Sequence, residues 1–364
     1  MTLAQCADNP AEDAGKQSPD YVRISAAAAM ELRLVRGRFL RDCSCGCINL
    51  LQNYDVSCTA NCTYCGLART REGESVDKSF IRVDWPLYPT SLVAEKVAEK
   101  EARSGVGRVC VSQVHHPRAY PDLIAISQAI HQAAPAVPLS ALVSASTLNE
   151  ERLVEVKDVG VDIIGVGLDA VTPELFSNTR GKGAKGPHSW EYHWKMIRAA
   201  RRLFGPMKVN CHIMVGLGET DRDLMELFHN LKEEQIAAYL FSFNPEEGTA
   251  MEAAPRAPLH RLRRVQLVKN LVEEHGLPRE AVGFNDAGEI ARLEAPELMV
   301  RRAIAGGKAF MTDGCPDRQG EMTCNRPYGS YRPGEPFRDY PFRPEADDLA
   351  VIGKEMRLED IWRP

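Results

Sequence analysis

The stretch INLLQNYDVSCTANCTYC (residues 48–65) decides the fold expected for this chain. Its first half is a short apolar run of the kind that forms a buried β-strand. Its second half is a loop in which Cys58, Cys62 and Cys65 follow the spacing C-x3-C-x2-C. The cysteine loop therefore follows a strand directly, and the segments downstream indicate which kind of sheet that strand belongs to.

Downstream of Cys65 the chain alternates between amphipathic segments and short apolar runs. The amphipathic spacing predicts helices over residues 91–105, 122–134, 148–160, 190–205, 220–235, 259–276 and 295–307. The apolar runs predict strands over residues 48–56, 107–114, 138–145, 161–170, 207–216, 237–243, 281–286 and 308–314. Strands that alternate with helices form parallel sheets. We therefore expect an α/β fold, a TIM-like (β/α)8 barrel, with a doubly wound open sheet as the alternative.

The two ends of the chain differ from this alternating region. Residues 24–42 are rich in alanine and predict a helix within an N-terminal extension over 1–47. The barrel is expected over 48–315. Residues 316–364 are rich in proline, arginine and aromatic side chains, and predict an irregular tail that wraps around the barrel.

Composition narrows the class of protein. The 364 residues are 44% hydrophobic and 26% charged, as in a globular protein with a real core. A net charge of −5 disfavours nucleic-acid binding, and no apolar run approaches the roughly 20 residues of a membrane span. With no apolar signal segment at the N-terminus, we expect a cytoplasmic protein. Its eleven cysteines then indicate metal binding or catalysis rather than disulfides.

The cysteine loop suits one kind of metal site. Three thiolates on one short loop can hold three irons of a 4Fe–4S cubane. The fourth iron then has no protein ligand and can chelate the amino and carboxylate groups of a bound molecule. The alternative is a zinc knuckle, which is usually completed by a fourth cysteine or histidine nearby. The nearest downstream histidine is His115.

Several segments carry a resemblance to a known family. They are YCGLARTR, GLDAVTPELFSNTR, KVNCHIMVGLGET and FNPEEGTAME, which begin at residues 64, 167, 208 and 243. They resemble the radical S-adenosylmethionine superfamily and, more closely, its biotin-synthase-like branch. The resemblance covers roughly residues 48–315. It implies a catalytic 4Fe–4S cluster on Cys58, Cys62 and Cys65, with S-adenosylmethionine beside it at the C-terminal face of the barrel.

The resemblance also implies which residues bind the cofactor: Tyr64, Gln113, Asp169, Arg180, Met214 and Glu219. Tyr64 and Met214 would pack near the adenine, and Asp169 would hold the ribose hydroxyls. Arg180 would donate to the methionine carboxylate. Gln113 stands where many relatives carry a glutamate beside the methionine amino group. The alternatives are a solvated loop pair for Asp169 and Arg180, and core packing for Met214.

Biotin synthase itself builds a second, internal cluster from cysteines on three strands. Cys110 occupies the first of these positions, but the other two are Leu142 and Asn210. Cys211 is adjacent to Asn210 and points to the opposite face, because side chains alternate along a strand. We therefore expect no such internal cluster, and interpret Cys110 as a packed core thiol.

Five other cysteines are candidates for a second 4Fe–4S cluster. Cys43, Cys45 and Cys47 alternate along an extended segment, which would place their thiols on one side. Cys315 follows the last expected strand, so it should lie at the catalytic face, and Cys324 follows nine residues later. Five thiols are one more than a cubane needs. The alternatives are a reduced cysteine-rich terminus and a structural zinc site.

This layout most resembles the two-protein lipoyl synthases, in which two radical enzymes together add both sulfurs. It implies a sulfurtransferase that adds sulfur to an octanoyl chain on a lipoyl carrier protein. The implied partners are a second radical enzyme and a reductant of the ferredoxin or flavodoxin type. The alternatives are an enzyme that rearranges a small molecule, as in methylornithine or hydrogenase-cofactor synthesis, and a non-catalytic iron–sulfur or zinc scaffold.

The basic helix expected at 259–276 offers a place for the carrier protein. It carries Arg261, Arg263, Arg264 and Lys269, which could dock an acidic domain. The alternative is an ordinary solvated helix face.

Overall fold

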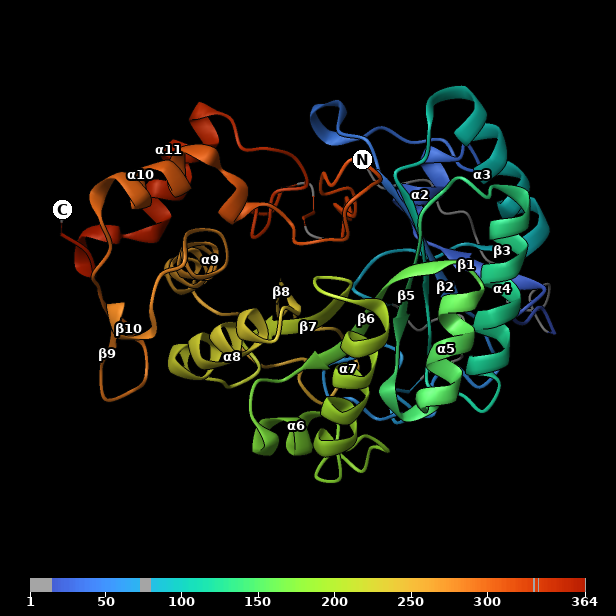
Figure 1. Ribbon diagram of the computed structural model, residues 1–364, viewed down its shortest axis with the longest axis horizontal. Coiled ribbons are helices and arrows are strands. Elements are labelled where there is room, and N and C mark those ends of the chain that lie inside the picture. Colours follow the sequence, from blue (N-terminus) through green and yellow to red (C-terminus); the bar gives the residue numbers. More distant parts are fainter. Residues whose placement is uncertain (1–14, 73–79, 330, 333, 364) are drawn as a thin grey trace.

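The computed structural model describes residues 15–72, 80–329, 331–332 and 334–363. The first 14 residues of the expected N-terminal extension lie outside this part of the chain. The described residues build one mostly parallel sheet, with strand order β3-β1-β2-β4-β5-β6-β7-β8 (Figure 1). The α/β fold class is thereby confirmed.

Six strands of the sheet run parallel, as expected. They are β2 (Cys47–Gln52), β4 (Arg108–Ser112), β5 (Leu139–Val143), β6 (Val161–Asp169), β7 (Val209–Val215) and β8 (Ala237–Ser242). Two strands that the sequence analysis missed, β1 (Tyr21–Ile24) and β3 (Leu87–Pro89), extend the sheet beyond β2 in antiparallel pairing. The N-terminal extension is therefore part of the main sheet.

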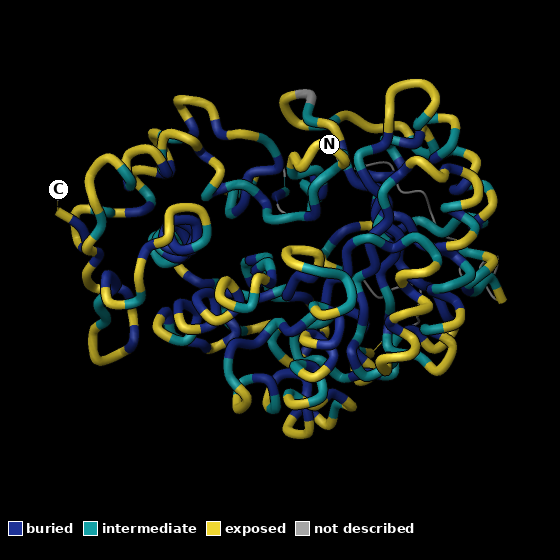
Figure 2. The backbone as a smooth tube through the Cα atoms, viewed as in Figure 1, coloured by how far each residue is buried: buried dark blue, intermediate teal, exposed yellow. Residues whose placement is uncertain are grey.

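Helices alternate with the parallel strands and cover the outer face of the sheet (Figures 1 and 2). They are α3 (Thr90–Ser104), α4 (Ala119–Ala133), α5 (Glu150–Asp158), α6 (Pro173–Thr179), α7 (Trp190–Phe204) and α8 (Asp221–Glu233). Side-chain caps set the starts of α5, α6, α7 and α8, as at α7, where the Ser189 hydroxyl accepts from the Tyr192 amide. Gly205, with φ of 98°, ends the same helix in a conformation that favours glycine. No described helix is both long and apolar enough to cross a bilayer.

Side-chain alternation along the strands separates an outer core from an interior. On β7, Cys211 is fully buried in the main core under the helices, whereas its neighbour Asn210 points to the inner side. On the inner side, Cys47 of β2, Ile163 of β6 and Tyr239 of β8 belong to one packed cluster. Residues from strands this far apart in the order meet only because the sheet curves around its interior, consistent with a TIM-like barrel.

The alternation of parallel strands and helices ends after β8. The helix α9 (Leu259–His275) is followed by β9 (Val282–Phe284) and β10 (Ile290–Leu293), which pair with each other in a separate two-stranded sheet. The strand expected at 281–286 is therefore present but does not join the main sheet. The strand expected at 308–314 was wrong: after α10 (Glu297–Gly306) come a short 3-10 turn, Lys308–Phe310, and a single bridge at Met311.

Both ends of the chain also differ from expectation. The helix expected at 24–42 is only α2 (Ala26–Glu31), because the chain turns at Arg33, whose φ is 60°. The tail contains a helix, α11 (Ala346–Met356), which packs on α9. The tail is therefore not irregular throughout.

Intramolecular pairing, part of it with the tail, accounts for the basic residues of α9. Arg263 is fully buried and pairs with Glu355 at 2.8 Å, and Lys269 pairs with Glu273 and Asp313 at 2.6 and 3.1 Å. Arg264 bonds to tail carbonyls and Asp360, while Arg261 pairs with Glu219 and Asp221. Both interpretations of these side chains, a carrier-docking surface and a solvated face, were therefore wrong.

Candidate active site

A cavity of about 300 Å³ lies inside the curved sheet. The thiols Cys58, Cys62 and Cys65 line one part of it, and Cys110, Cys315 and Cys324 line another. Much of the remaining wall is apolar, with Leu51, Leu67, Val83, Trp85, Val114, Leu142, Phe241 and Phe243. An enclosed, mostly apolar cavity with a few polar groups is typical of a small-molecule site.

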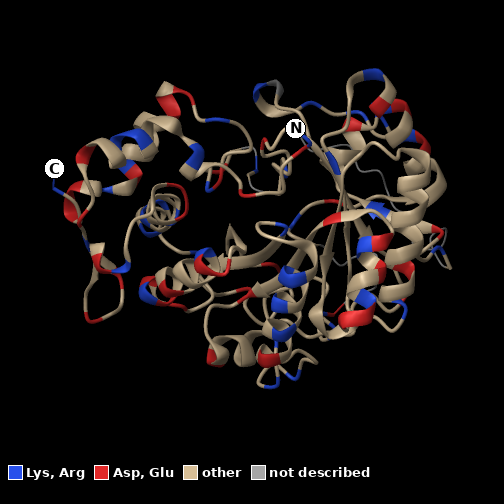
Figure 3. Ribbon diagram, viewed as in Figure 1, with Lys and Arg blue, Asp and Glu red and all other residues tan. Residues whose placement is uncertain are grey.

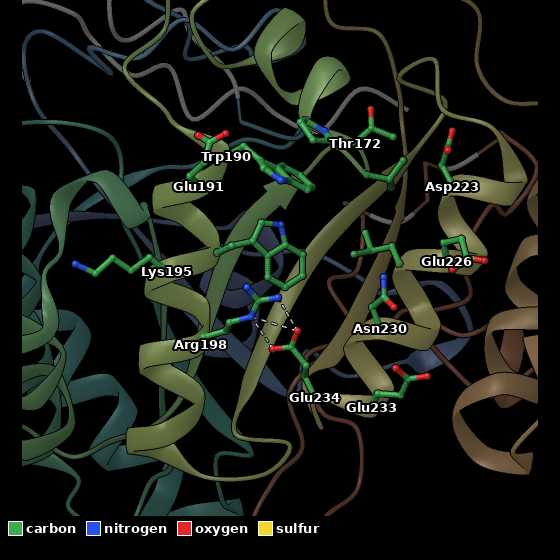
Figure 4. A pocket seen from close by; sticks show the side chains of 14 residues that line it. Thr172, Trp190, Glu191, Lys195, Arg198, Asp223, Glu226, Asn230, Glu233 and Glu234 are labelled. Atoms are coloured by element: carbon green, nitrogen blue, oxygen red, sulfur yellow. Dashed lines mark hydrogen bonds and ion pairs between the residues drawn. The ribbon is translucent and has the colours of Figure 1, made fainter.

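A larger hollow of about 860 Å³ lies on the outside of the molecule between α7 and α8 (Figure 4). It is open to solvent, and several of its charges are already paired, as Arg198 is with Glu234 at 2.8 Å. No cysteine lines it. The interior cavity, although smaller, is therefore the candidate active site.

The cysteine loop is held at the carboxyl ends of the strands by backbone hydrogen bonds from several elements. The Thr59 amide donates to the His115 carbonyl, just beyond β4, and the Thr63 amide donates to the Thr179 carbonyl at the end of α6. The His115 amide donates to Cys58 Sγ at 3.3 Å. These bonds fix the loop so that Cys58, Cys62 and Cys65 face the cavity, as predicted.

The three thiols suit an iron–sulfur cluster in their chemistry. None of these three cysteines forms a disulfide. Burial raises the pKa of Cys62 to about 11 and also raises the pKa of Cys65 well above its usual value. A buried thiol loses its proton readily only to a positive partner such as a metal centre.

Next to Cys62, three of the predicted cofactor-binding residues meet. Asp169, the last residue of β6, accepts from the Tyr64 hydroxyl at 2.5 Å and forms an ion pair with Arg180. The Arg180 side chain is only 6% exposed, so the alternative of a solvated loop pair was wrong. Its Nε has no acceptor among the described residues. A buried donor without an acceptor is costly, and a ligand carboxylate would satisfy it.

The other three predicted cofactor residues, Met214, Gln113 and Glu219, differ in whether they face the cavity. Met214 and Gln113 both line the cavity. Gln113 already donates to the Ala119 carbonyl and accepts from Thr147, so both ends of its amide are occupied. Glu219 does not line the cavity; its carboxylate accepts from the Gly216 and Leu217 amides and pairs with Arg261. Glu219 therefore holds the turn after β7 rather than facing the cofactor position.

A second group of thiols lies deeper in the barrel. Cys47, Cys110, Cys315 and Cys324 pack together, and we call them the cysteine quartet. The neighbouring Cys47 thiol lowers the pKa of Cys324, and Arg326 acts in the same direction. Polar side chains also reach the quartet: Asn210 donates to Cys315 Sγ at 3.8 Å, and Arg326 to Cys324 Sγ at 3.8 Å.

The quartet lies toward the amino ends of the strands, where Cys47 begins β2 and Cys110 is the third residue of β4. The expectation that Cys315 lies at the catalytic face was therefore wrong. Its premise, a strand at 308–314, is absent, and the tail instead folds back at Cys315, whose carbonyl accepts from the Cys324 amide at 3.2 Å.

The fold-back of the tail requires glycines at its contacts. A Cβ on Gly46 or Gly107 would overlap Thr323, and one on Gly314 would overlap Cys324. The buried Arg108 donates to the Pro316 carbonyl at 2.8 Å and ties the same segment to β4. Residues 314–324 therefore close the amino end of the barrel.

The composition of the quartet differs from the predicted ligand set. Cys45 is buried in the outer core and its thiol donates to the Cys47 carbonyl at 3.1 Å, while Cys43 lies beside Tyr331. The three thiols of this segment therefore do not share one side. Cys110, interpreted as a packed core thiol, is packed against the other three cysteines of the quartet. The sequence feature that could have identified Cys110 as a member of this group was its match to a cluster-ligand position of biotin synthase.

The spacing of these thiols bears on what they can bind. Among the described residues, no three or more His, Cys, Asp or Glu side chains converge on a point that would hold a single metal ion. In a cubane each thiolate binds a different iron, so the ligands surround a cluster rather than a point. Cys58, Cys62 and Cys65 all line the cavity, as do Cys110, Cys315 and Cys324 of the quartet.

Comparisons with known proteins agree with this geometry. Residues 56–231 match the Radical SAM superfamily. An uncharacterized protein of Methanocaldococcus jannaschii is 25% identical over 198 residues, or 54% of this chain and 48% of that protein. A biotin synthase of Aquifex aeolicus is 24% identical over 201 residues, or 55% and 56% of the two chains. The chain spans about half the length of these relatives.

A solved structure of methylornithine synthase aligns over 93% of this chain and 87% of its own, with 15% identity and a TM-score of 0.49. At this level the similarity adds nothing to what the sheet itself shows. The cofactor roles of individual side chains in the cavity remain predictions.

Proposed function

The chain carries a radical SAM domain with biotin synthase relatives, and from this we propose that it inserts sulfur into an octanoyl chain on a lipoyl carrier protein. One observation supports the proposal above all: a single apolar cavity touches two separate groups of cysteines. Radical generation at one group and sulfur donation at the other would then act on the same bound chain.

The loop cysteines are the proposed site of radical generation. A 4Fe–4S cluster held there supplies the electron that cleaves S-adenosylmethionine into methionine and a radical able to remove hydrogen from an unactivated carbon. Around it, Asp169 can accept from ribose hydroxyls, and the free Nε–H of Arg180 can donate to the methionine carboxylate. Met214 provides an apolar contact for the adenine.

The quartet is the proposed sulfur source. Four thiols suffice for all four irons of a second 4Fe–4S cluster, and the hydrogen bonds from Asn210 and Arg326 would stabilise their thiolates. Hydrogen bonds to ligand atoms are a common means of tuning a metal site. The lipoyl-type layout explains why the tail carries two of these ligands.

The cavity wall fits an alkyl chain. Leu51, Trp85 and Phe241 present apolar surface to the cavity. An acyl chain against such surface gains hydrophobic stabilisation of about 0.8 kcal/mol per buried CH₂. Exclusion of water from this space would also protect a radical from side reactions. A ferredoxin- or flavodoxin-type protein would supply the electron, and a second radical enzyme the other sulfur.

The experiment tests both groups of cysteines together. Anaerobically reconstituted protein is incubated with an octanoyl-lysine peptide, S-adenosylmethionine and reductant, and the peptide is analysed by mass spectrometry. The double variant Cys315→Ala/Cys324→Ala should still release 5′-deoxyadenosine but yield no thiolated peptide. Cys211→Ala, a buried cysteine of the outer core, is the matched control and should yield product.

Iron and sulfide counts separate the proposal from its rival. About eight irons per chain are expected for two cubanes, falling to about four in the double variant. About four irons in the unchanged chain, with deoxyadenosine but no thiolated peptide, would instead favour rearrangement of a small molecule. Absence of deoxyadenosine would leave only a non-catalytic scaffold.

A further inference from the structure

One edge of the cavity is formed by two segments far apart in sequence. Residues 80–83 and tail residues 327 and 329 both line it. The two segments meet where Ile81 approaches Gly329 and where the Arg332 guanidinium donates to the Arg82 carbonyl. From the other side the Arg82 amide donates to Glu246 at 2.6 Å. These bonds fix the backbone at this edge.

Three arginines surround this edge, and we call them the arginine collar: Arg82, Arg256 and Arg332. All three interact with one carboxylate, Glu335. Arg256 lies 3.0 Å from a Glu335 oxygen, and Arg82 lies 3.7 Å from the other. The Arg256 side chain is 33% exposed and Glu335 is 34% exposed, so the collar reaches the surface.

Within the described part of the chain, the three arginines of the collar outnumber the carboxylates that act on Arg82. Among the described residues the carboxylates that act on Arg82 are Glu335 and the buried Glu246. Burial lowers the pKa of Arg82, and repulsion from Arg332 and Arg256 lowers it further. An additional carboxylate would relieve this repulsion.

The charge of the collar is opposite in sign to the net charge of the whole molecule. The chain has a net charge of −5, and acidic and basic residues are mixed over its outer helices (Figure 3). The net charge would repel an acidic partner at a distance, whereas the collar would attract it locally. Local charge of this kind steers a partner toward one orientation.

We propose that the arginine collar docks an acidic carrier protein, so that the acyl chain it bears enters the cavity past Arg82. This inference rests on the proposed function. It also places carrier docking at a different part of the molecule from α9, since the basic residues of α9 are paired with acidic side chains or bonded to the tail. Carrier contacts at the collar would mainly raise the rate of association, and this effect would weaken as the salt concentration increases.

The test compares two substrates with the same acyl group. One is an octanoylated lipoyl-type carrier domain with an acidic surface, and the other is an uncharged octanoyl-lysine peptide. The double variant Arg256→Glu/Arg332→Glu leaves the cavity-lining Arg82 intact. For this variant we expect KM for the carrier to rise about tenfold or more, well beyond any change in kcat or KM for the peptide.

Arg302→Glu, at an exposed position on α10, is the matched control and should leave both substrates unaffected. The rise in KM for the carrier in the double variant should become smaller as the salt concentration increases. An equal loss with peptide and carrier would show that the collar only holds the fold, and would overturn the proposal. A second result would also overturn it. If inorganic phosphate inhibited the peptide reaction of the unchanged chain but not of the double variant, and the two proteins had the same carrier kinetics, the collar would be a site for small anions.

Direct binding separates this inference from the proposed function. Affinity of the unchanged chain for the octanoylated carrier is measured by calorimetry, without S-adenosylmethionine. If neither substrate is thiolated but binding is lost in the double variant, the proposed function fails and the docking surface stands. If thiolation occurs and carrier binding is the same in both proteins, the docking surface is wrong and the function stands.

Discussion

The cysteine loop and the cysteine quartet lie at opposite ends of one cavity and are built in different ways. The loop places three thiols within residues 58–65, held by hydrogen bonds to neighbouring segments. The quartet takes its thiols from β2, β4 and the tail, and exists only when the tail packs against Gly46 and Gly107. A local motif survives changes elsewhere in the fold, whereas an assembled site depends on every contact that brings its parts together.

Loss of a loop thiol should have the largest effect. In Cys62→Ala only two loop ligands remain, so the cluster is not retained and deoxyadenosine release should fall below about 1% of that of the unchanged chain. The measurement is chromatography of the reaction with excess reductant. Cleavage at the unchanged rate would show that these thiols do not hold the radical-generating centre.

A comparison of Cys110→Ala with Cys43→Ala sharpens the description of the quartet. Cys110 is in the quartet and Cys43 is not, so only Cys110→Ala should lose thiolated product, by at least about tenfold. Both should release deoxyadenosine normally. If Cys43→Ala were the inactive variant, the ligand set predicted from sequence would be correct and the quartet would be a packing cluster.

Replacement of Arg180 by lysine tests the geometry beside the loop. Lysine keeps the charge near Asp169 but lacks the free Nε–H, and a charge-assisted hydrogen bond contributes about 1.5–3 kcal/mol. We expect KM for S-adenosylmethionine to rise about 10- to 100-fold. Unaltered KM, measured from initial rates of deoxyadenosine release, would mean that Arg180 only positions Asp169.

The smallest effect is expected from Gly46→Ala. The new methyl group would overlap Thr323, and overpacking of this kind costs about 1–3 kcal/mol. Iron content and thiolation should fall by a few-fold while cleavage of S-adenosylmethionine is retained, because only the amino end is disturbed. Thr323→Ala in the same chain should restore part of the loss. Equal loss of both activities would indicate that the two ends are not independent.

The difference between the two sites also explains what could be predicted from sequence. The six parallel strands and the cysteine loop follow from local patterns, apolar runs and short spacing, and all were placed correctly. Asp169 and Arg180 were found through family resemblance, and the structure adds the buried ion pair that holds them. Glu219 was misassigned because a motif position does not reveal that its carboxylate is occupied by Gly216 and Arg261.

The parts that could not be predicted depend on long-range packing. Nothing local distinguishes a strand at 308–314 from the turn and bridge that form there, because β-pairing is decided by the available partner. The same holds for Cys110, whose neighbours Cys315 and Cys324 are about 200 residues away in the sequence. The polar pattern of α9 suggested a solvated face because its partner, α11, lies in a tail that was expected to be irregular.

The fold-back of the tail has a consequence for synthesis of the chain. Chains are made from the amino end, and early segments can fold before later ones appear. Cys58, Cys62 and Cys65 leave the ribosome some 250 residues before Cys315, so the first site can mature on a nascent chain. The quartet cannot assemble until translation is nearly complete. Under the proposed function, a chain truncated before Cys324 would therefore keep the loop thiols but lack the source of sulfur.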